Sequence, residues 1–160
     1  MRVESATVVP VEREVLWAAL LRWEDQARWM RDADSVRVLS PHREGVGVRI
    51  AVRTRVLHVP LFTEQLEVTY WEPPRCLAMA HRSFVRGVGT WSLEPEGPGT
   101  RFVWTEELAL AVPILGEAAL LVYRPFLRRL MRGALMNLCA YVLGEGGSIA
   151  PAAGESGEPG

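Results

Sequence analysis

The stretch that decides the fold runs from Pro113 to Leu143 and reads PILGEAALLVYRPFLRRLMRGALMNLCAYVL. Apolar residues recur in it at helical spacing, which predicts a long amphipathic helix with one apolar stripe. That stripe consists of Leu127, Leu130, Met131, Ala134, Leu138 and Tyr141. Pro125 lacks a backbone N–H, so we expect it either to kink the helix or to begin its main part after a shorter lead-in helix at 114–123.

The chain before this helix carries the alternating patterns of β-strands. Two breaker-rich turns, Glu72-Pro73-Pro74-Arg75 and Pro95 to Gly99, separate neighbouring strands closely enough to make the sheet antiparallel. The predicted elements are a strand at 3–9, two short helices at 12–22 and 24–30, and strands at 35–39, 46–56, 63–71, 76–83, 88–94 and 100–110.

These elements predict an α+β fold in one domain. A curved antiparallel sheet of six to seven strands wraps around the long C-terminal helix, because one amphipathic helix needs a sheet to cover its stripe. Two short helices lie between strands 1 and 2. We assign residues 1–144 to this domain and residues 145–160, which are rich in Gly, Ala, Pro, Ser and Glu, to a disordered tail.

Composition excludes several classes of function. The net charge of -1 argues against a general nucleic-acid binder, and all 18 basic residues are arginine, which rules out a lysine Schiff base. Three scattered histidines give no metal-ligand spacing, so we expect no metal and no cofactor. Cys76 and Cys139 are isolated and read as free thiols. With no secretory signal and no apolar run long enough to cross a bilayer, we expect a cytoplasmic protein.

Several short motifs, spread over residues 3–143, occur in a characteristic order. They are Val9-Pro10, Val15-Leu16-Trp17-Ala18-Ala19-Leu20, Trp29, Ser35-Val36, Gly45-Val46-Gly47, Trp71-Glu72-Pro73-Pro74, Gly89-Thr90-Trp91-Ser92-Leu93 and Gly99-Thr100-Arg101. In this order they resemble the START-like helix-grip superfamily (SRPBCC), above all its bacterial polyketide cyclase/dehydrase and lipid-transport branch. The resemblance implies binding or transport of a lipid, quinone or polyketide-like molecule, or else a polyketide aromatase/cyclase-type reaction in the same cavity.

Such a cavity would lie between the sheet and the C-terminal helix. Side chains alternate between the two faces of a strand, so residues an even number of positions apart share a face; we call this strand parity. Strand parity and the helix stripe predict the ligand-binding residues Ile50, Val52, Leu66, Val68, Tyr70, Met79, His81, Trp91, Phe102, Trp104, Glu106, Leu130, Ala134, Asn137 and Leu138. A wall this aromatic suits a flat or acyl-chain ligand. The alternative is that these residues simply fill the core.

Glu106 and His81 are the candidate catalytic residues. Glu106 shares the parity of Phe102 and Trp104, so we expect it to point inward, where burial would tune it as an acid or base. The alternative is a strand-end residue that reaches water or pairs with Arg124. His81 is either a base in the cavity or a hydrogen-bonded wall residue. Asn137 either orients a polar ligand group or bonds helix to sheet.

A last feature is the apolar segment that leads into the basic cluster of the long helix. Apolar residues beside arginines are typical of helices that lie on anionic membranes, so Leu110 to Arg132 is a candidate for peripheral membrane contact. The alternatives are that the segment closes the cavity as a gate or forms a homodimer interface.

Overall fold

The structure is a computed structural model of the chain, and it describes residues 1–56, 59–83, 85–110 and 115–145. In chain order its elements are β1 (Arg2–Val9), α1 (Arg13–Leu20), the 3₁₀ turn η1 (Trp23–Asp25), α2 (Gln26–Trp29), β2 (Ala33–Val38), β3 (Arg49–Val56), β4 (Val59–Glu72), β5 (Cys76–Arg82), β6 (Val85–Glu96), β7 (Gly99–Leu110) and α3 (Leu115–Glu145). The α+β class, the strand order and the short helices between β1 and β2 are as the sequence predicts.

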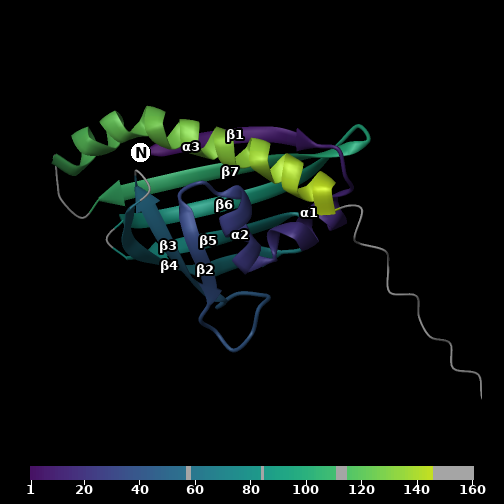
Figure 1. Cartoon of the computed structure of the whole chain (residues 1–160), viewed down its shortest axis with the longest axis horizontal. Helices are drawn as coiled ribbons and strands as arrows, with labels where there is room; N and C mark the ends of the chain where they lie inside the picture. The colour runs from purple at the N-terminus through teal and green to yellow at the C-terminus, as the bar shows by residue number, and fades with distance from the viewer. Residues whose placement is uncertain (57–58, 84, 111–114, 146–160) are drawn as a thin grey trace, which may run out of the picture.

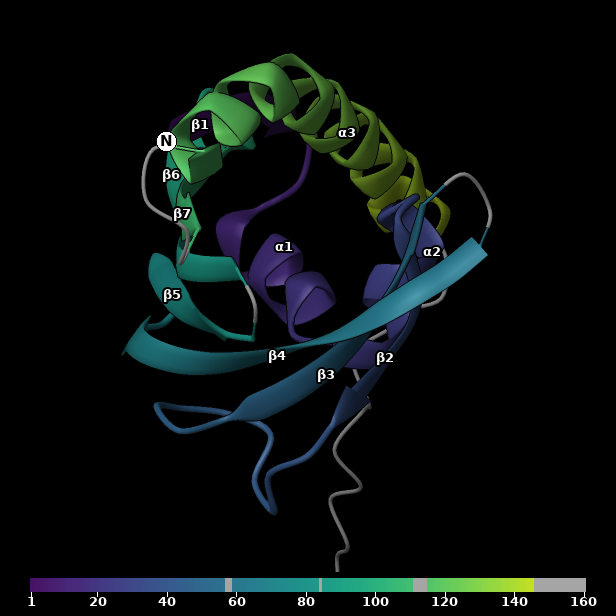
Figure 2. The same ribbon diagram turned by 90° about the vertical axis from the view of Figure 1, so that its left-hand side faces the viewer.

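The strands form one seven-stranded antiparallel sheet in the order β1-β7-β6-β5-β4-β3-β2. Strands β2 to β7 follow one another as a meander, and β1 closes the far edge by pairing with β7 from Arg2↔Glu107 to Val9↔Thr100. Figure 2 shows the sheet bending round so that α3 lies across its open side, with α1 and α2 on the inside of the bend. The helix therefore covers the concave face of the sheet, which is the helix-grip arrangement.

The core lies where α3 meets the sheet and the short helices. Met131, Ala134, Leu138 and Tyr141 of the predicted stripe are buried, and Leu127 and Leu130 are partly buried. Aromatic rings pack below them: the Trp91 ring lies 6.1 Å from that of Trp29 and 6.0 Å from that of Phe102. Burial of these large side chains supplies the main driving force for folding.

Helix α3 continues through Pro125 without a break and arches over the sheet (Figures 1 and 2), so the prediction that this proline divides a lead-in helix from a main helix is wrong. Pro125 removes only one hydrogen bond, the one to the carbonyl of Leu121. Packing of the remaining stripe against the sheet keeps the helix continuous. Residue 114, the first of the predicted lead-in helix, lies outside the described residues, as do residues 111–113 of the apolar segment that begins at Leu110.

Two other boundaries differ from prediction. Strand β3 begins at Arg49 rather than Val46, because Gly45 and Gly47 adopt positive φ angles of 93° and 90° and turn the backbone there. Val46 is accordingly 62% exposed. At the other end, Glu145 is the last residue of α3 and the rest of the predicted tail, 146–160, lies outside the described residues. None of the described helices combines the length and apolar content needed to cross a membrane.

The packing of α3 on the sheet can be tested by truncating one buried side chain. Leu138→Ala should lower the free energy of unfolding by about 2–5 kcal/mol, because Leu138 is 0% exposed and its loss leaves a cavity. Met136→Ala is the matched control on the same helix: Met136 is 74% exposed, so we expect a change within about 0.5 kcal/mol. Urea unfolding measures both. Equal effects would show that α3 does not bury the stripe assigned to it.

Candidate functional site

A cavity of about 160 Å³ lies between α3 and the concave face of the sheet. Most of its wall is apolar and comes from Met30, Val52, Phe62, Leu66, Met79, Val85, Trp91, Trp104, Leu108, Leu127, Leu130, Met131 and Ala134. Polar groups line the remainder, and they are Gln26, Asp32, Thr54, Glu64, His81, Glu106 and Tyr123. An apolar cavity with a few convergent polar groups is the usual form of a small-molecule site.

The structure brings together at this cavity many of the residues that the sequence singles out. They are Val52, Leu66, Met79, His81, Trp91, Trp104, Glu106, Leu130 and Ala134. Ile50, Val68, Phe102 and Leu138 are buried in the core but do not line the cavity. Asn137 donates a hydrogen bond of 3.1 Å from Nδ2 to the carbonyl of Trp29, so it holds α3 against α2. Ligand binding by the lining residues stays a prediction.

The side chain of Tyr70 does not lie on the face that strand parity predicts for it in β4. The register between β4 and β5 shifts between Val68 and Tyr70, which turns the tyrosine away from the inner face. Tyr70 is 48% exposed, whereas Val68 is 1% exposed. The Tyr70 hydroxyl donates a 2.6 Å hydrogen bond to Glu72 outside the cavity. The prediction that Tyr70 lines the cavity is therefore wrong.

The polar end of the cavity is organised by His81. Its Nδ1 lies 2.7 Å from Oε1 of Glu64, and its Nε2 lies 3.0 Å from Oε2 of Glu106. Trp104 donates a further hydrogen bond of 2.7 Å from Nε1 to Oε1 of Glu106. The three titratable side chains come from β4, β5 and β7 and are about 10–16% exposed. Glu106 thus points inward, and its partners are His81 and Trp104 rather than Arg124.

Glycine in β6 makes this contact between non-adjacent strands possible. Strand β6 lies between β5 and β7, and Gly89 pairs in register with Met79 on one side and Glu106 on the other. A Cβ at position 89 would lie only 2.8 Å from Oε1 of Glu106. Because Gly89 has no side chain, the Glu106 carboxylate can lie over β6 and reach His81.

The environment of His81 favours its charged form. Burial alone lowers the pKa of an imidazole, but the hydrogen bonds to Glu106 and Glu64 outweigh burial and raise the pKa of His81 from 6.5 to about 10. At neutral pH both ring nitrogens therefore carry protons and donate to the two carboxylates. His81 is a protonated partner within the cluster, which does not suit it to act as a base.

A third carboxyl group, that of Asp32, lies at this end of the cavity. Burial raises the pKa of Asp32, and the nearby charges of Glu64 and Glu106 raise it further. Burial is the largest cause that raises the pKa of the Tyr123 hydroxyl, and the charges of Asp32, Glu64 and Glu106 raise it further. No arginine is among the residues that line the described cavity, and the chain has no lysine. The polar end is thus rich in carboxylates with one buried cation.

Sequence reasoning missed Asp32 and Glu64. Glu64 has the parity of Leu66 and Val68 on β4, so strict alternation would have placed it inward beside them. Asp32 precedes β2 in a turn, where no periodicity marks the direction of a side chain. Among the described residues, no group of three His, Cys, Asp or Glu side chains has an arrangement that would hold a metal ion.

A curved antiparallel sheet closed by one long C-terminal helix, with a cavity between them, defines a helix-grip protein. The family model described as polyketide cyclase/dehydrase and lipid transport matches residues 1–142, and the chain belongs to this family. No curated protein matches the chain.

Solved structures with the same fold have low sequence identity. The protein TTHA0849 from Thermus thermophilus has a TM-score of 0.75 at 21% identity, and the match covers 90% of this chain and 98% of that protein. The Zhui aromatase/cyclase from Streptomyces sp. R1128 has a TM-score of 0.68 at 19% identity, with 96% and 98% covered. A START superfamily protein from Mycobacterium smegmatis has a TM-score of 0.65 at 14% identity, with 93% and 99% covered. At these identities the likeness establishes the fold alone.

The charge on His81 predicts a specific dependence of stability on pH. The pKa is higher in the folded state than in the unfolded state, so the stabilisation is complete below about pH 6.5 and is lost as the pH rises toward 10. The difference in free energy of unfolding between the native chain and His81→Gln should fall across this window, by at most about 1.4 kcal/mol per pH unit.

Urea unfolding at several values of pH from 6.5 to 9.5 measures this difference. His42→Gln is the matched control, because His42 is exposed and its ring hydrogen-bonds the backbone carbonyl of Val46 rather than a carboxylate. A difference between the native chain and His81→Gln that stays constant with pH would show that His81 is neutral in the folded protein.

Proposed function

We propose that the chain binds and carries a hydrophobic small molecule in the cavity under α3. The proposal rests on one observation, namely that an apolar cavity in the fold interior ends in a cluster of buried carboxylates. A core built only for stability gains little from buried ion pairs, because desolvation offsets most of their attraction. Buried titratable groups that converge on a cavity are instead typical of binding sites.

The same cluster indicates the polar group of the ligand. Both ring nitrogens of His81 donate to glutamates, so the imidazolium offers no free N–H to a ligand carboxylate. Glu64, Glu106 and Asp32 accept hydrogen bonds when ionised and repel a further negative charge. We therefore infer a ligand with a flat or chain-like apolar body and a hydroxyl or ammonium group, and we exclude carboxylates such as free fatty acids.

The second candidate function is an aromatase/cyclase-type reaction in the same cavity. Imidazole and carboxylate side chains are the groups that general acid–base catalysis uses, and here they lie at a cavity wall. Against this, the glutamates already occupy both nitrogens of His81. Incubation with a poly-β-ketothioester would decide the question: mass spectrometry would show loss of water from the substrate if the chain catalyses cyclisation and aromatisation.

We also propose a cytoplasmic location. Cys76 and Cys139 are both free thiols, which is the usual state in a reducing compartment.

Three naphthalene derivatives that differ only in one substituent test the proposed ligand class. At pH 7.5, naphthalene-2-methanol and 2-naphthylmethylamine should bind, and 2-naphthoic acid should bind at least about tenfold more weakly, because its carboxylate faces the acidic end of the cavity. Isothermal titration calorimetry measures the three affinities. Equal binding of all three would contradict the inferred polar group but leave the binding function standing.

A pair of alanine variants tests whether these ligands occupy the cavity. Ala134→Leu places three more carbons at the cavity wall and should abolish binding of all three compounds. Ala140→Leu is the matched control on the exposed side of α3 and should leave binding unchanged. Circular dichroism confirms that each variant is folded. Binding that survives in Ala134→Leu, or that is absent from the native chain, would refute the cavity as a ligand site.

A further inference from the structure

The outer face of α3, the side turned away from the sheet, is unusually apolar for an exposed helix surface. Val122 is 79% exposed, Met136 74% and Leu121 64%, and Phe126 and Leu143 are also about half exposed. Figures 1 and 2 show that no other described element lies over this side of the helix. Exposed apolar residues gathered on one surface mark an interaction site more often than single ones do.

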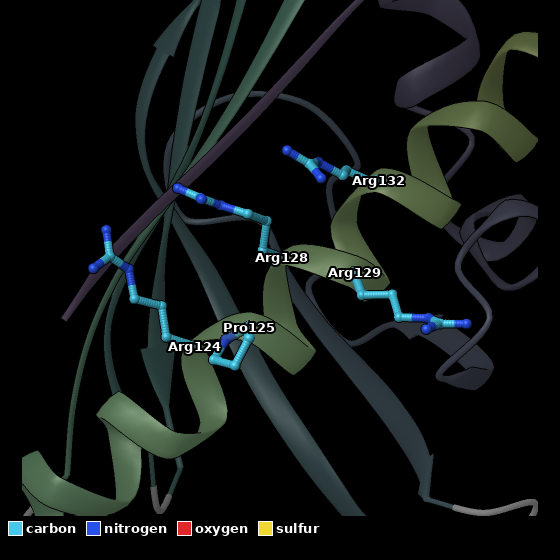
Figure 3. A pocket seen from close by; sticks show the side chains of 5 residues that line it. All are labelled: Arg124, Pro125, Arg128, Arg129 and Arg132. Carbon is cyan, nitrogen blue, oxygen red and sulfur yellow. The ribbon is translucent and has the colours of Figure 1, made fainter.

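Arginines accompany these apolar residues. Arg124, Arg128, Arg129 and Arg132, with Pro125, line an open groove of about 620 Å³ along α3. Figure 3 shows Arg124, Arg128 and Arg132 extending toward one side of the helix and Arg129 toward the other.

Within the part of the chain that the structure describes, no carboxylate neutralises the charge of this face. Arginines elsewhere pair with carboxylates, as Arg75 does with Glu72 at 3.2 Å and Arg82 with Glu67 at 3.1 Å. None of the four arginines of the groove has such a partner among the described residues. The sequence from Ala118 to Gly144 contains no acidic residue at all. In a chain of net charge -1, this is a local concentration of positive charge.

We propose that the outer face of α3 docks on an anionic lipid surface. A bilayer interface accepts both parts of the face at once, since apolar side chains enter the acyl boundary while arginines reach the anionic headgroups. A second copy of the chain, docked face to face about a two-fold axis, would bring the two arginine clusters together. A nucleic acid would pair with the arginines but leave Val122, Met136 and Leu121 without an apolar partner.

Docking also has a consequence for access to the cavity. Tyr123, Leu127 and Leu130, on the same helix, line the cavity from its other side. If α3 docks, the cavity lies one helix thickness from the bilayer. A hydrophobic ligand is most concentrated in the bilayer, so docking places the cavity close to it. The docking itself does not depend on the proposed ligand.

Vesicle flotation tests the proposal with the full chain. We expect binding to phosphatidylcholine vesicles that contain about 30% phosphatidylglycerol and weak binding to phosphatidylcholine alone. Binding should be lost as NaCl rises from about 0.1 to about 0.5 M, because screening of surface charge becomes strong over this range. Arg128→Gln with Arg129→Gln should weaken binding about 25-fold, since each arginine near an anionic surface contributes about fivefold.

Matched variants elsewhere on the chain serve as controls. Arg37→Gln with Arg49→Gln removes the same charge from exposed positions on β2 and β3 and should leave vesicle binding unchanged. Val122→Gln should weaken binding, whereas Val46→Gln, the same change at a residue that is 62% exposed, should not.

Four outcomes would overturn the proposal. The first is no binding to any vesicle, and the second is an equal loss of binding in the two pairs of arginine variants. The third is binding that Val122→Gln does not affect, which would mean electrostatic adsorption only. The fourth is a dimer, seen by light scattering without lipid, that Val122→Gln dissociates, which would make this face a homodimer interface.

Discussion

The hydrogen bonds of His81 to Glu64 and Glu106 are the interaction on which the site depends. They join side chains from β4, β5 and β7 across a strand that contributes only glycine at the point of contact. The curl of the sheet brings these strands to one concave face, and α3 covers that face. Two consequences follow together, an imidazolium that stays charged and a cavity whose polar end is rich in carboxyl groups. The proposed preference against anionic ligands rests on both.

The two sides of helix α3 differ in the charge that surrounds them. The inner side of α3 closes an acidic cavity, and its outer side carries four arginines and exposed apolar residues. Because the arginines lie on the outside, they cannot neutralise the carboxylates on the inside. We propose that cavity and outer face take different partners, the first a neutral or cationic small molecule and the second an anionic surface.

The sequence predicts the fold well, because most strands and the long helix carry a regular pattern of apolar residues. One arrangement, a curved sheet around the helix, buries these apolar faces together. Strand parity placed Glu106 and His81 inward, and the structure agrees. Parity failed for Tyr70, because alternation alone does not reveal the register shift in β4. The expectation of two separate helices failed at Pro125, because tertiary packing keeps α3 continuous. Glu64 carried a usable signal in its alternation with Leu66. Asp32 carried none, because its position depends on a turn.

The protonation state of His81 tests the central claim most directly. Long-range ¹H–¹⁵N NMR of the imidazole, assigned with His81→Gln, reports each ring nitrogen separately. A pKa raised to about 10 predicts that both nitrogens remain protonated through pH 8.5. A neutral ring at pH 7.5 would contradict the account, because Glu64 and Glu106 would then not hold His81 as a buried cation and the proposed charge of the cavity would be wrong.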